Sequence, residues 1–259
     1  MTAPELRIMD DGTELAREAA DLVVWLGGEA IAANGRFRVA LSGGTTPRTL
    51  YGTLAGLNSS RRMDWSKAEF FFGDERCVPP DHPESNFRMA QETLFQPLRI
   101  GQQQIFRMPG EAPDPERAAR QYETMIRTQF ETPAPAWPCF DLVLLGLGED
   151  GHTASLFPGT PALDEKDRLV VSSQSPKGVK ARLTLTVPAI NRARTVVFLV
   201  SGAGKEAIVR SVLEGTKGED RSLPATMIRP AQGRLIWFLD RVAAAGLTIA
   251  KQGMVSHEE

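Results

Sequence analysis

His152 is the residue of this chain whose type and setting most favour chemistry. It is one of three histidines and ends the stretch Gly146-Leu-Gly-Glu-Asp-Gly-His152, which follows an unbroken apolar run from Leu142 to Leu145. Such a run is typical of a strand covered on both faces, and ligands bind where these strands end in an α/β sheet. Because an imidazole titrates near neutral pH, this position suits proton transfer. We therefore predict that His152 is catalytic and that Asp150 orients its ring or stabilises its charged form.

A second pair of polar side chains, Asp74 and Arg76, follows the apolar stretch from Ala68 to Phe72. We expect this stretch to be a neighbouring strand, so that both side chains point to the same edge of the sheet as His152. The alternative is a local ion pair within Asp74-Glu75-Arg76 at the start of a loop. Both residues are candidates for the catalytic site.

Other reaction types lack the residues that they need. The chain contains no Gly-x-Ser-x-Gly turn, so a serine hydrolase is not expected. Its scattered histidines and the separated Cys77 and Cys139 provide no cluster of metal ligands. The spacing of Gly146–Gly151 matches the dinucleotide fingerprint, but Pro158 cuts the following helix short and no acidic residue ends the next predicted strand. We predict neither a metal nor an organic cofactor.

Glycine-rich turns follow three of the predicted strands, at residues 42–45, 146–151 and 201–204. Backbone N–H groups in such turns, backed by a helix N-terminus, can bind phosphate or carboxylate, although each turn alone could simply join a strand to a helix. Arg48 and Lys205 fall in the first turn of the helices that follow two of these turns, where a cation opposes the helix dipole by about 0.3–1 kcal/mol. Since a bound anion would reverse that sign, we predict an anionic ligand. The candidate binding residues are Ser42, Gly43, Gly44, Thr45, Arg48 and Lys205.

The elements that must position these residues alternate between strands and helices. Apolar stretches predict strands at residues 6–9, 37–41, 68–72, 142–145, 169–172, 194–200 and 235–239, and residues 182–187 alternate as a strand with one face partly wet would. Helical patterns lie between them, one of them expected to begin at Asp11 and to stop at Asn34-Gly35. This alternation predicts an α/β fold with a mostly parallel sheet.

The composition and net charge are typical of a soluble globular protein. The 259 residues are 42% apolar and 24% charged, and the formal net charge is −2, which does not favour a nucleic-acid binder. We find no secretory signal and no apolar run long enough to span a bilayer, so we expect a cytoplasmic protein that is not bound to a membrane. No shift in composition divides residues 1–259, which we interpret as one domain with a core of about 5–250 and a polar tail from about Gln252.

Five motifs carry a resemblance to a known family. They are Ser42-Gly-Gly-Thr-Thr-Pro47, Gly73-Asp-Glu-Arg76 with Ser85-Asn-Phe87, Gly146-x-Gly-x-Asp-Gly-His-Thr-Ala-Ser-Leu-Phe-Pro158, Arg182-Leu-Thr-Leu-Thr186 and Ser201-Gly-x-Gly-Lys205. In this order, from about residue 37 to about residue 228, they resemble the 6-phosphogluconolactonase family. Its superfamily also contains glucosamine-6-phosphate deaminase and ribose-5-phosphate isomerase. The resemblance implies a Rossmann-like three-layer α/β/α fold. The composition of the loop from Val78 to Glu84 makes it a candidate small lid or edge subdomain.

The same resemblance implies a reaction and roles for the candidate residues. The expected reaction is hydrolysis of 6-phospho-D-glucono-1,5-lactone, in which His152 would activate water and Asp150 would orient it. Arg76 or nearby backbone N–H groups would stabilise the oxyanion, and Asp74 would position Arg76 or a substrate hydroxyl. Residues 42–45, with Arg48, Arg182 and Lys205, would bind the phosphate. The implied partner is a small sugar phosphate, bound by a monomer or a homodimer.

Two other functions stay open at this point, and the first is a glucosamine-6-phosphate deaminase or another sugar-phosphate isomerase. In the deaminase the histidine motif continues into Asn-Glu-Pro, and that glutamate takes part in ring opening. Phe157 stands before the proline here and cannot move a proton, which favours the lactonase. A non-catalytic sugar-phosphate sensor is the second alternative, but a sensor would not need both His152 and Asp150.

Overall fold

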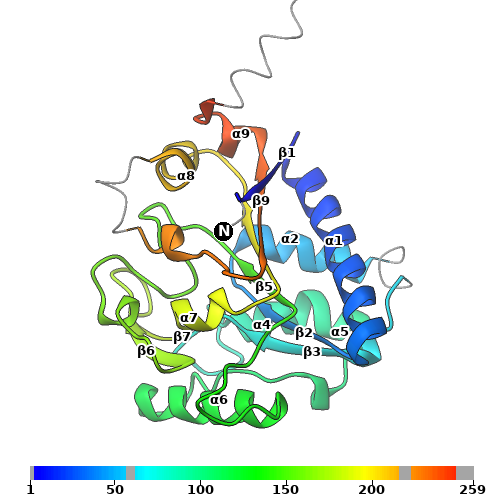
Figure 1. The fold of residues 1–259 in the computed structure, drawn as a ribbon, viewed down its shortest axis with the longest axis vertical. Helices are drawn as coiled ribbons and strands as arrows, with labels where there is room; N and C mark the ends of the chain where they lie inside the picture. Colours follow the sequence, from blue (N-terminus) through cyan, green and yellow to red (C-terminus); the bar gives the residue numbers. More distant parts are fainter. Residues whose placement is uncertain (1–2, 57–61, 216–222, 249–259) are drawn as a thin grey trace, which may run out of the picture.

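A sheet of six parallel strands forms the centre of the molecule, in the order β1-β9-β8-β5-β2-β3 (Figure 1). The computed structural model describes residues 3–56, 62–215 and 223–248. The strands are β1 (Glu5–Met9), β2 (Phe37–Leu41), β3 (Ala68–Phe72), β5 (Leu142–Leu145), β8 (Thr195–Val200) and β9 (Arg234–Asp240). Every pairing in this sheet is parallel, which confirms the predicted α/β class. The tail predicted from Gln252 lies outside the described residues.

Helices flank the central sheet, with α1 and α2 side by side (Figure 1). The α-helices are α1 (Gly12–Asn34), α2 (Thr45–Ala55), α4 (Asn86–Ala90), α5 (Gln96–Leu98), α6 (Pro115–Gln129), α7 (Val187–Asn191), α8 (Glu206–Glu214) and α9 (Arg241–Ala244). A π-helical turn, η2 (Gln91–Phe95), joins α4 to α5, and 3-10 turns occupy η1 (Trp65–Lys67), η3 (Gln102–Gln104), η4 (Pro161–Leu163) and η5 (Pro224–Met227). None of the helices in the described part of the chain is both long enough and apolar enough to cross a membrane.

Helix α1 begins and ends where its sequence predicts. The Asp11 carboxylate accepts hydrogen bonds from the backbone N–H groups of Thr13 and Glu14, at 2.8 and 2.9 Å. At the other end Gly35 has a φ of 75° and donates its N–H to the carbonyl of Ile31. These contacts satisfy backbone groups that a helix otherwise leaves unpaired at its ends.

Strand β3 shows why the central strands lack polar alternation. Phe70 and Phe72 point to one face and contact Phe95, with ring centroids 5.1 and 6.4 Å apart. Phe71 points to the other face and contacts Phe106 and Phe140, at 4.8 and 5.4 Å. Since successive side chains of a strand alternate between faces, both faces of the sheet are covered. An apolar residue is therefore needed at every position.

A second, antiparallel sheet of three strands lies beside the first, in the order β4-β7-β6. Its strands are β4 (Asp74–Arg76), β6 (Val170–Gln174) and β7 (Ala181–Leu185). The sequence had predicted Asp74 and Arg76 at the end of a parallel strand, but Gly73 separates them from β3 and they start a strand of their own. The partly wet face predicted for residues 182–187 is also wrong, because Leu183, Thr184 and Leu185 are fully buried.

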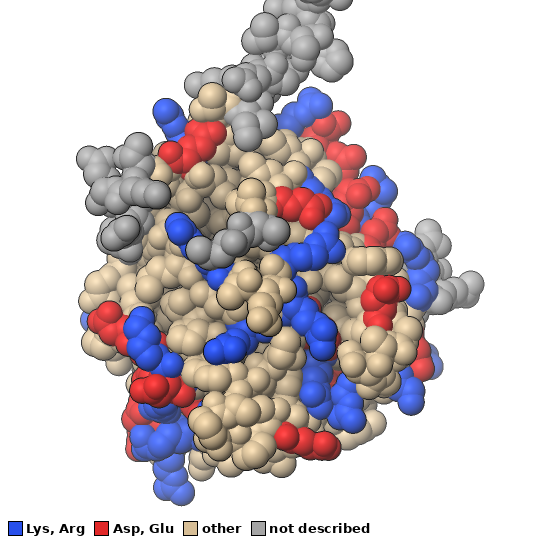
Figure 2. All heavy atoms as spheres, viewed as in Figure 1, with Lys and Arg blue, Asp and Glu red and all other residues tan. Residues whose placement is uncertain are grey.

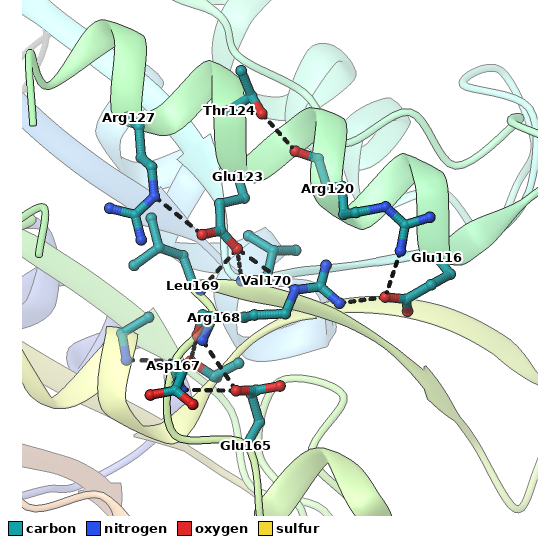
Figure 3. A network of polar contacts seen from close by, with 12 residues as sticks. Glu116, Arg120, Glu123, Thr124, Arg127, Glu165, Asp167, Arg168, Leu169 and Val170 are labelled. Carbon is teal, nitrogen blue, oxygen red and sulfur yellow. Dashed lines mark hydrogen bonds and ion pairs between the residues drawn. The ribbon is translucent and has the colours of Figure 1, made fainter. Parts of the chain in front are cut away.

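Helix α6 holds the second sheet through a polar network (Figure 3). Arg168, just before β6, forms ion pairs with Glu116 and Glu123 of α6. Glu123 also accepts the N–H of Leu169 at 3.0 Å, and Glu116 accepts the hydroxyl of Ser172 at 3.0 Å. Two carboxylates of one helix thus bind both the side chains and the backbone at the start of β6. We define Arg168, Glu116 and Glu123 as the α6 clamp.

The surface carries charges of both signs. Figure 2 shows Lys and Arg side chains interspersed with Asp and Glu side chains over the face seen in Figure 1. This distribution fits the small net charge of −2.

Candidate active site

A cleft of about 650 Å³ lies between the carboxyl edge of the central sheet and the second sheet. The three glycine turns all open into it, following β2, β5 and β8, which are neighbours in the middle of the sheet. Ten of the eleven predicted site residues line this cleft: Ser42, Gly43, Gly44, Thr45, Asp74, Arg76, Asp150, His152, Arg182 and Lys205. Residues separated by more than a hundred positions in the chain therefore meet at the edge where parallel strands end.

Arg48 is the predicted residue that the structure does not bring into the cleft. It lies in the first turn of α2, as expected, but its side chain is exposed and does not line the cleft. The Arg48 charge instead helps to lower the pKa of Glu92, after the hydrogen bond from Arg88, which lowers that pKa most.

His152 and Asp150 form a hydrogen-bonded pair at the mouth of the cleft. Nδ1 of the ring contacts Oδ1 of Asp150, and the same oxygen accepts the His152 N–H at 3.1 Å. Partial burial acts to raise the pKa of Asp150, but the hydrogen bonds from His152 outweigh it and the net shift is downward. Asp150 is therefore a carboxylate near neutral pH, and a carboxylate can only accept. Nδ1 must then carry the proton, which leaves Nε2 free to act as a base.

Glycine is required beneath the His152 ring. A Cβ atom on Gly148 would lie 2.0 Å from Nδ1 and 2.1 Å from Cε1 of that ring, far inside van der Waals contact. The Gly148 N–H also donates to the carbonyl of His152 at 2.8 Å, and Gly151 has a φ of 78°. The turn thus folds back on itself to present the ring, and the next helical element is the short η4 turn.

The Phe157 ring packs against the His152 ring. The two ring centroids are 4.7 Å apart, and Phe157 is almost completely buried. The position before Pro158 is therefore filled by an apolar wall, which offers no group that could exchange a proton.

Asp74 is held by hydrogen bonds rather than by the local ion pair considered from the sequence. Its Oδ2 accepts the hydroxyl of Ser155 at 2.6 Å, and its Oδ1 accepts the amide of Asn86 at 3.2 Å. The Asn86 amide in turn occupies the space above Gly43, where a Cβ atom would lie 1.9 Å from Oδ1 of Asn86. Asp74 thereby connects the glycine turn at residue 43 with the turn that carries His152.

Asn86, Ser155 and Lys177 are polar residues at the cleft that were not singled out from the sequence. All three residues line the cleft. Asn86 and Ser155 stand inside motifs that carried the family resemblance, which was the available signal. Lys177 lies in the turn between β6 and β7, and no glycine turn after an apolar strand marks its position in the sequence.

Positive charge in the cleft is not neutralised by ion pairs. Arg76 and Arg182 are directly opposite each other in the β4–β7 register, and neither pairs with a described carboxylate within 4 Å. Like charges in this arrangement repel. Burial lowers the pKa of Arg182, and the charge of Arg76 lowers it further. A bound anion would relieve this repulsion.

Several buried donors in the same cleft have no protein acceptor. The Nε atoms of Arg76 and Arg182 and the hydroxyl of Ser42 are buried without a hydrogen-bond partner among the described residues. Such groups are normally paired, so they indicate where a ligand supplies oxygen atoms. Lys205, at the N-cap of α8, donates to the carbonyl of Leu147 at 2.9 Å and keeps two further donors available. Within the described ranges, no cluster of three metal-ligating side chains was found.

Comparison with known proteins agrees with this geometry. The model of the family described as glucosamine-6-phosphate isomerases/6-phosphogluconolactonase matches residues 10–237. The chain belongs to this family. A relative named 6-phosphogluconolactonase from Synechocystis is 44% identical over 245 residues, which cover 95% of this chain and 99% of the relative.

Solved structures show the same fold. The 6-phosphogluconolactonase from Trypanosoma cruzi superposes with a TM-score of 0.85 at 32% identity, covering 95% of this chain and 97% of that one. A monomeric glucosamine-6-phosphate deaminase has a TM-score of 0.76 at 24% identity, covering 94% and 100%. Because both share the architecture, the fold alone does not distinguish the two reactions.

Proposed function

We propose that this family member hydrolyses 6-phospho-D-glucono-1,5-lactone to 6-phospho-D-gluconate, with His152 as the general base. The hydrogen-bonded His152–Asp150 pair in a cationic cleft is the observation that carries the proposal. The name shared by relatives such as the one from Synechocystis supports the substrate. We further propose a cytoplasmic enzyme that acts on a small sugar phosphate as a monomer or homodimer, without nucleic acid or membrane.

The proposed chemistry uses His152 twice. Nε2 takes a proton from water while the water oxygen bonds to the C1 carbonyl, giving a tetrahedral oxyanion and an imidazolium. When the bond between C1 and the ring oxygen breaks, the imidazolium returns that proton to the departing oxygen. Asp150 offsets the transient positive charge of the ring and keeps Nδ1 protonated. Proton transfer of this kind typically contributes about 10²–10⁴-fold to the rate.

The other cleft residues would bind and polarise the substrate. We assign the phosphoryl group to the turn at Ser42–Thr45, with Arg182 and Lys205, because these groups present unpaired donors to the cleft. Arg76 or backbone N–H groups of the glycine turns would stabilise the oxyanion. Asp74 already accepts from Ser155 and Asn86, so we propose that it positions these loops and a substrate hydroxyl rather than acting as the base.

Deamination of glucosamine 6-phosphate is the second candidate, since a solved deaminase shares the fold. The buried Phe157 against the His152 ring argues against it, because that reaction would need a proton-transferring group at this position. Ammonia release from glucosamine 6-phosphate by the purified protein would support the deaminase. We expect none above the background.

Turnover of the lactone is the decisive experiment. The purified protein should convert 6-phospho-D-glucono-1,5-lactone far faster than the compound hydrolyses spontaneously, as followed by a dehydrogenase that consumes the acid product. Heat-inactivated protein provides the background rate. A rate equal to that background would reject the lactonase and favour a sugar-phosphate sensor, provided that the protein still binds the product.

A further inference from the structure

The hairpin between β6 and β7 places a lysine at the cleft in a defined backbone conformation. The N–H of Ser175 donates to the carbonyl of Lys180 at 2.8 Å, which closes the hairpin. The buried hydroxyl of Ser175 donates to the carbonyl of Lys177 at 2.7 Å and accepts its N–H at 3.3 Å. Gly178 follows with a φ of 64°, a conformation that favours glycine. The Lys177 backbone is therefore fixed on both sides, and its residue lines the cleft.

The Lys177 ammonium has no partner in the described part of the chain. It makes no ion pair and no hydrogen bond there, whereas arginines elsewhere on the surface pair with carboxylates. The hairpin lies against Arg182, whose Nη2 is 3.9 Å from the position of a Cβ on Gly178. Glu84 also approaches this turn, 3.7 Å from the same position. Asp74 and Glu75 also act on Arg182 electrostatically, and Lys177, Arg76 and Arg182 supply the positive charges on this side of the cleft.

We propose that Lys177 is a further substrate-binding residue, which contacts the phosphoryl group together with Arg182. The proposal rests on the lactonase function proposed above and extends its phosphate site to the β6–β7 hairpin. The exposed lysine can reach an anion held by Arg182 without losing an existing partner, so no competing contact opposes binding. Lys177 also gives the open side of the cleft a charge that attracts an anionic substrate.

Lys180 provides a matched control on the same hairpin. It is also exposed and carries the same charge, but it does not line the cleft. Lys177→Ala and Lys180→Ala therefore change the net charge equally and differ in access to the ligand. Titration calorimetry with 6-phosphogluconate at low and moderate salt would compare both variants with the unmodified protein. Unchanged thermal unfolding would verify that each variant is folded.

We expect Lys177→Ala to weaken 6-phosphogluconate binding on the order of three- to tenfold, more at low salt, as for a partly exposed charge contact. Lys180→Ala should change the affinity by less than about twofold, since its charge is screened from the ligand. Inorganic phosphate, used as a competing ligand, should lose affinity in Lys177→Ala by a similar factor. Equal weakening by both variants, or no weakening by either, would overturn the proposal. Unchanged phosphate binding in Lys177→Ala would overturn the assignment to the phosphoryl group.

The two proposals can fail separately. If the unmodified protein neither binds 6-phosphogluconate nor hydrolyses the lactone, the lactonase function is wrong. Inorganic phosphate would still test Lys177 in that case, because the comparison with Lys180→Ala needs no turnover. If the unmodified protein turns over the lactone and Lys177→Ala binds 6-phosphogluconate as tightly as the unmodified protein does, only the role of Lys177 in binding is rejected.

Discussion

Three neighbours fix the imidazole of His152. The carboxylate of Asp150 holds Nδ1, the backbone at Gly148 lies against one side of the ring, and Phe157 packs on another. A ring that cannot rotate keeps Nε2 directed to the same place in the cleft. Fixing a base in this way lowers the entropic barrier to attack by water.

The first prediction concerns this imidazole. His152→Asn should lower kcat by about 10²–10⁴-fold and change KM much less, because the base acts in the transition state and contributes little to ground-state binding. Initial rates corrected for spontaneous hydrolysis would measure both constants. Asp150→Asn keeps the imidazole but replaces a carboxylate, which only accepts hydrogen bonds, with an amide. Since the amide no longer fixes the proton on Nδ1, kcat should also be lower than in the unmodified protein. A His152→Asn variant with nearly unchanged kcat would contradict the proposed base.

A second prediction separates binding from proton transfer. Lys205→Ala removes an ammonium that stands at the N-cap of α8 and donates to Leu147. We expect KM for the phosphorylated lactone to rise about tenfold or more, with a smaller effect on kcat, as for loss of a charged hydrogen bond. An unphosphorylated lactone serves as the control substrate. The phosphate assignment would be rejected by an equal rise in KM for both lactones.

At the scale of single residues, the sequence predicted the site where local rules apply. Ser42 begins a glycine turn after an apolar strand, His152 and Lys205 each follow one, and all three line the cleft. Asn86 and Ser155 could not be found in this way, because both act by binding Asp74, which lies 12 and 81 positions away along the chain. Arg48 shows the reverse case, where the predicted position in a helix was right but the side chain points elsewhere.

Among the elements, the junction of β4 with α4 depends on one buried carboxylate. Glu75 accepts the N–H groups of Arg76, Asn86 and Phe87 at 2.8 Å and the hydroxyl of Ser85 at 3.0 Å. Two of these donors belong to the first turn of α4, which would otherwise lack acceptors. Burial raises the pKa of Glu75 despite these hydrogen bonds.

The third prediction follows from this junction. Glu75→Gln should destabilise the protein by about 1–3 kcal/mol, because glutamine offers one acceptor oxygen where both oxygens of the carboxyl group now accept. Since the folded-state pKa of Glu75 is raised, its contribution is fully present below the unfolded pKa and is lost as pH rises through the folded pKa. The difference between the two proteins should therefore shrink from acidic towards neutral pH. Urea unfolding at several pH values would measure it, and a difference that grows with pH would contradict this sign.

Element boundaries were predictable where capping residues mark them, as at Asp11 and Gly35 of α1. The second sheet was not, because β4 has three residues and its partner β7 lies more than a hundred residues further on. The alternation of polar and apolar residues in β7 led to the wrong prediction of a partly wet face, because Thr184 is fully buried. Its hydroxyl accepts the Ser155 N–H and donates to the Leu185 carbonyl. A satisfied hydroxyl can occupy a core, and periodicity alone cannot reveal its partner.

For the whole molecule, the α6 clamp connects the second sheet to helix α6. That sheet carries Arg76 and Arg182, so its position affects the phosphate site. Arg168 is about one quarter exposed and contacts two carboxylates of α6. Glu123 is less exposed and binds Arg127 as well (Figure 3).

The fourth prediction compares two arginines that share Glu116. Arg168→Met should lower the free energy of unfolding by about 1–3 kcal/mol, because it removes the cation that Glu116 and Glu123 share and leaves each carboxylate with one arginine of α6. Arg120→Met removes an exposed pair within α6 and should cost about 0.5 kcal/mol or less. Urea unfolding would compare them. We also expect a higher KM for the phosphorylated lactone in Arg168→Met but not in Arg120→Met. Equal losses of stability in the two variants would show that the ion pairs of Arg168 stabilise the fold no more than an exposed pair does.

The pairing of β1 with β9 has a consequence for biosynthesis. Glu5 lies beside Ile236, and β1 is at the sheet edge with β9 as its only strand neighbour in the described part of the chain. Strand β9 follows β1 by more than two hundred residues, so β1 must wait for β9 to be synthesised before their hydrogen bonds can form. Contacts so remote along the polypeptide slow folding, and until they form the backbone groups of β1 and of one edge of β9 lack partners and can pair with other chains. We expect chaperones to bind the nascent chain until β9 has been synthesised and can pair with β1.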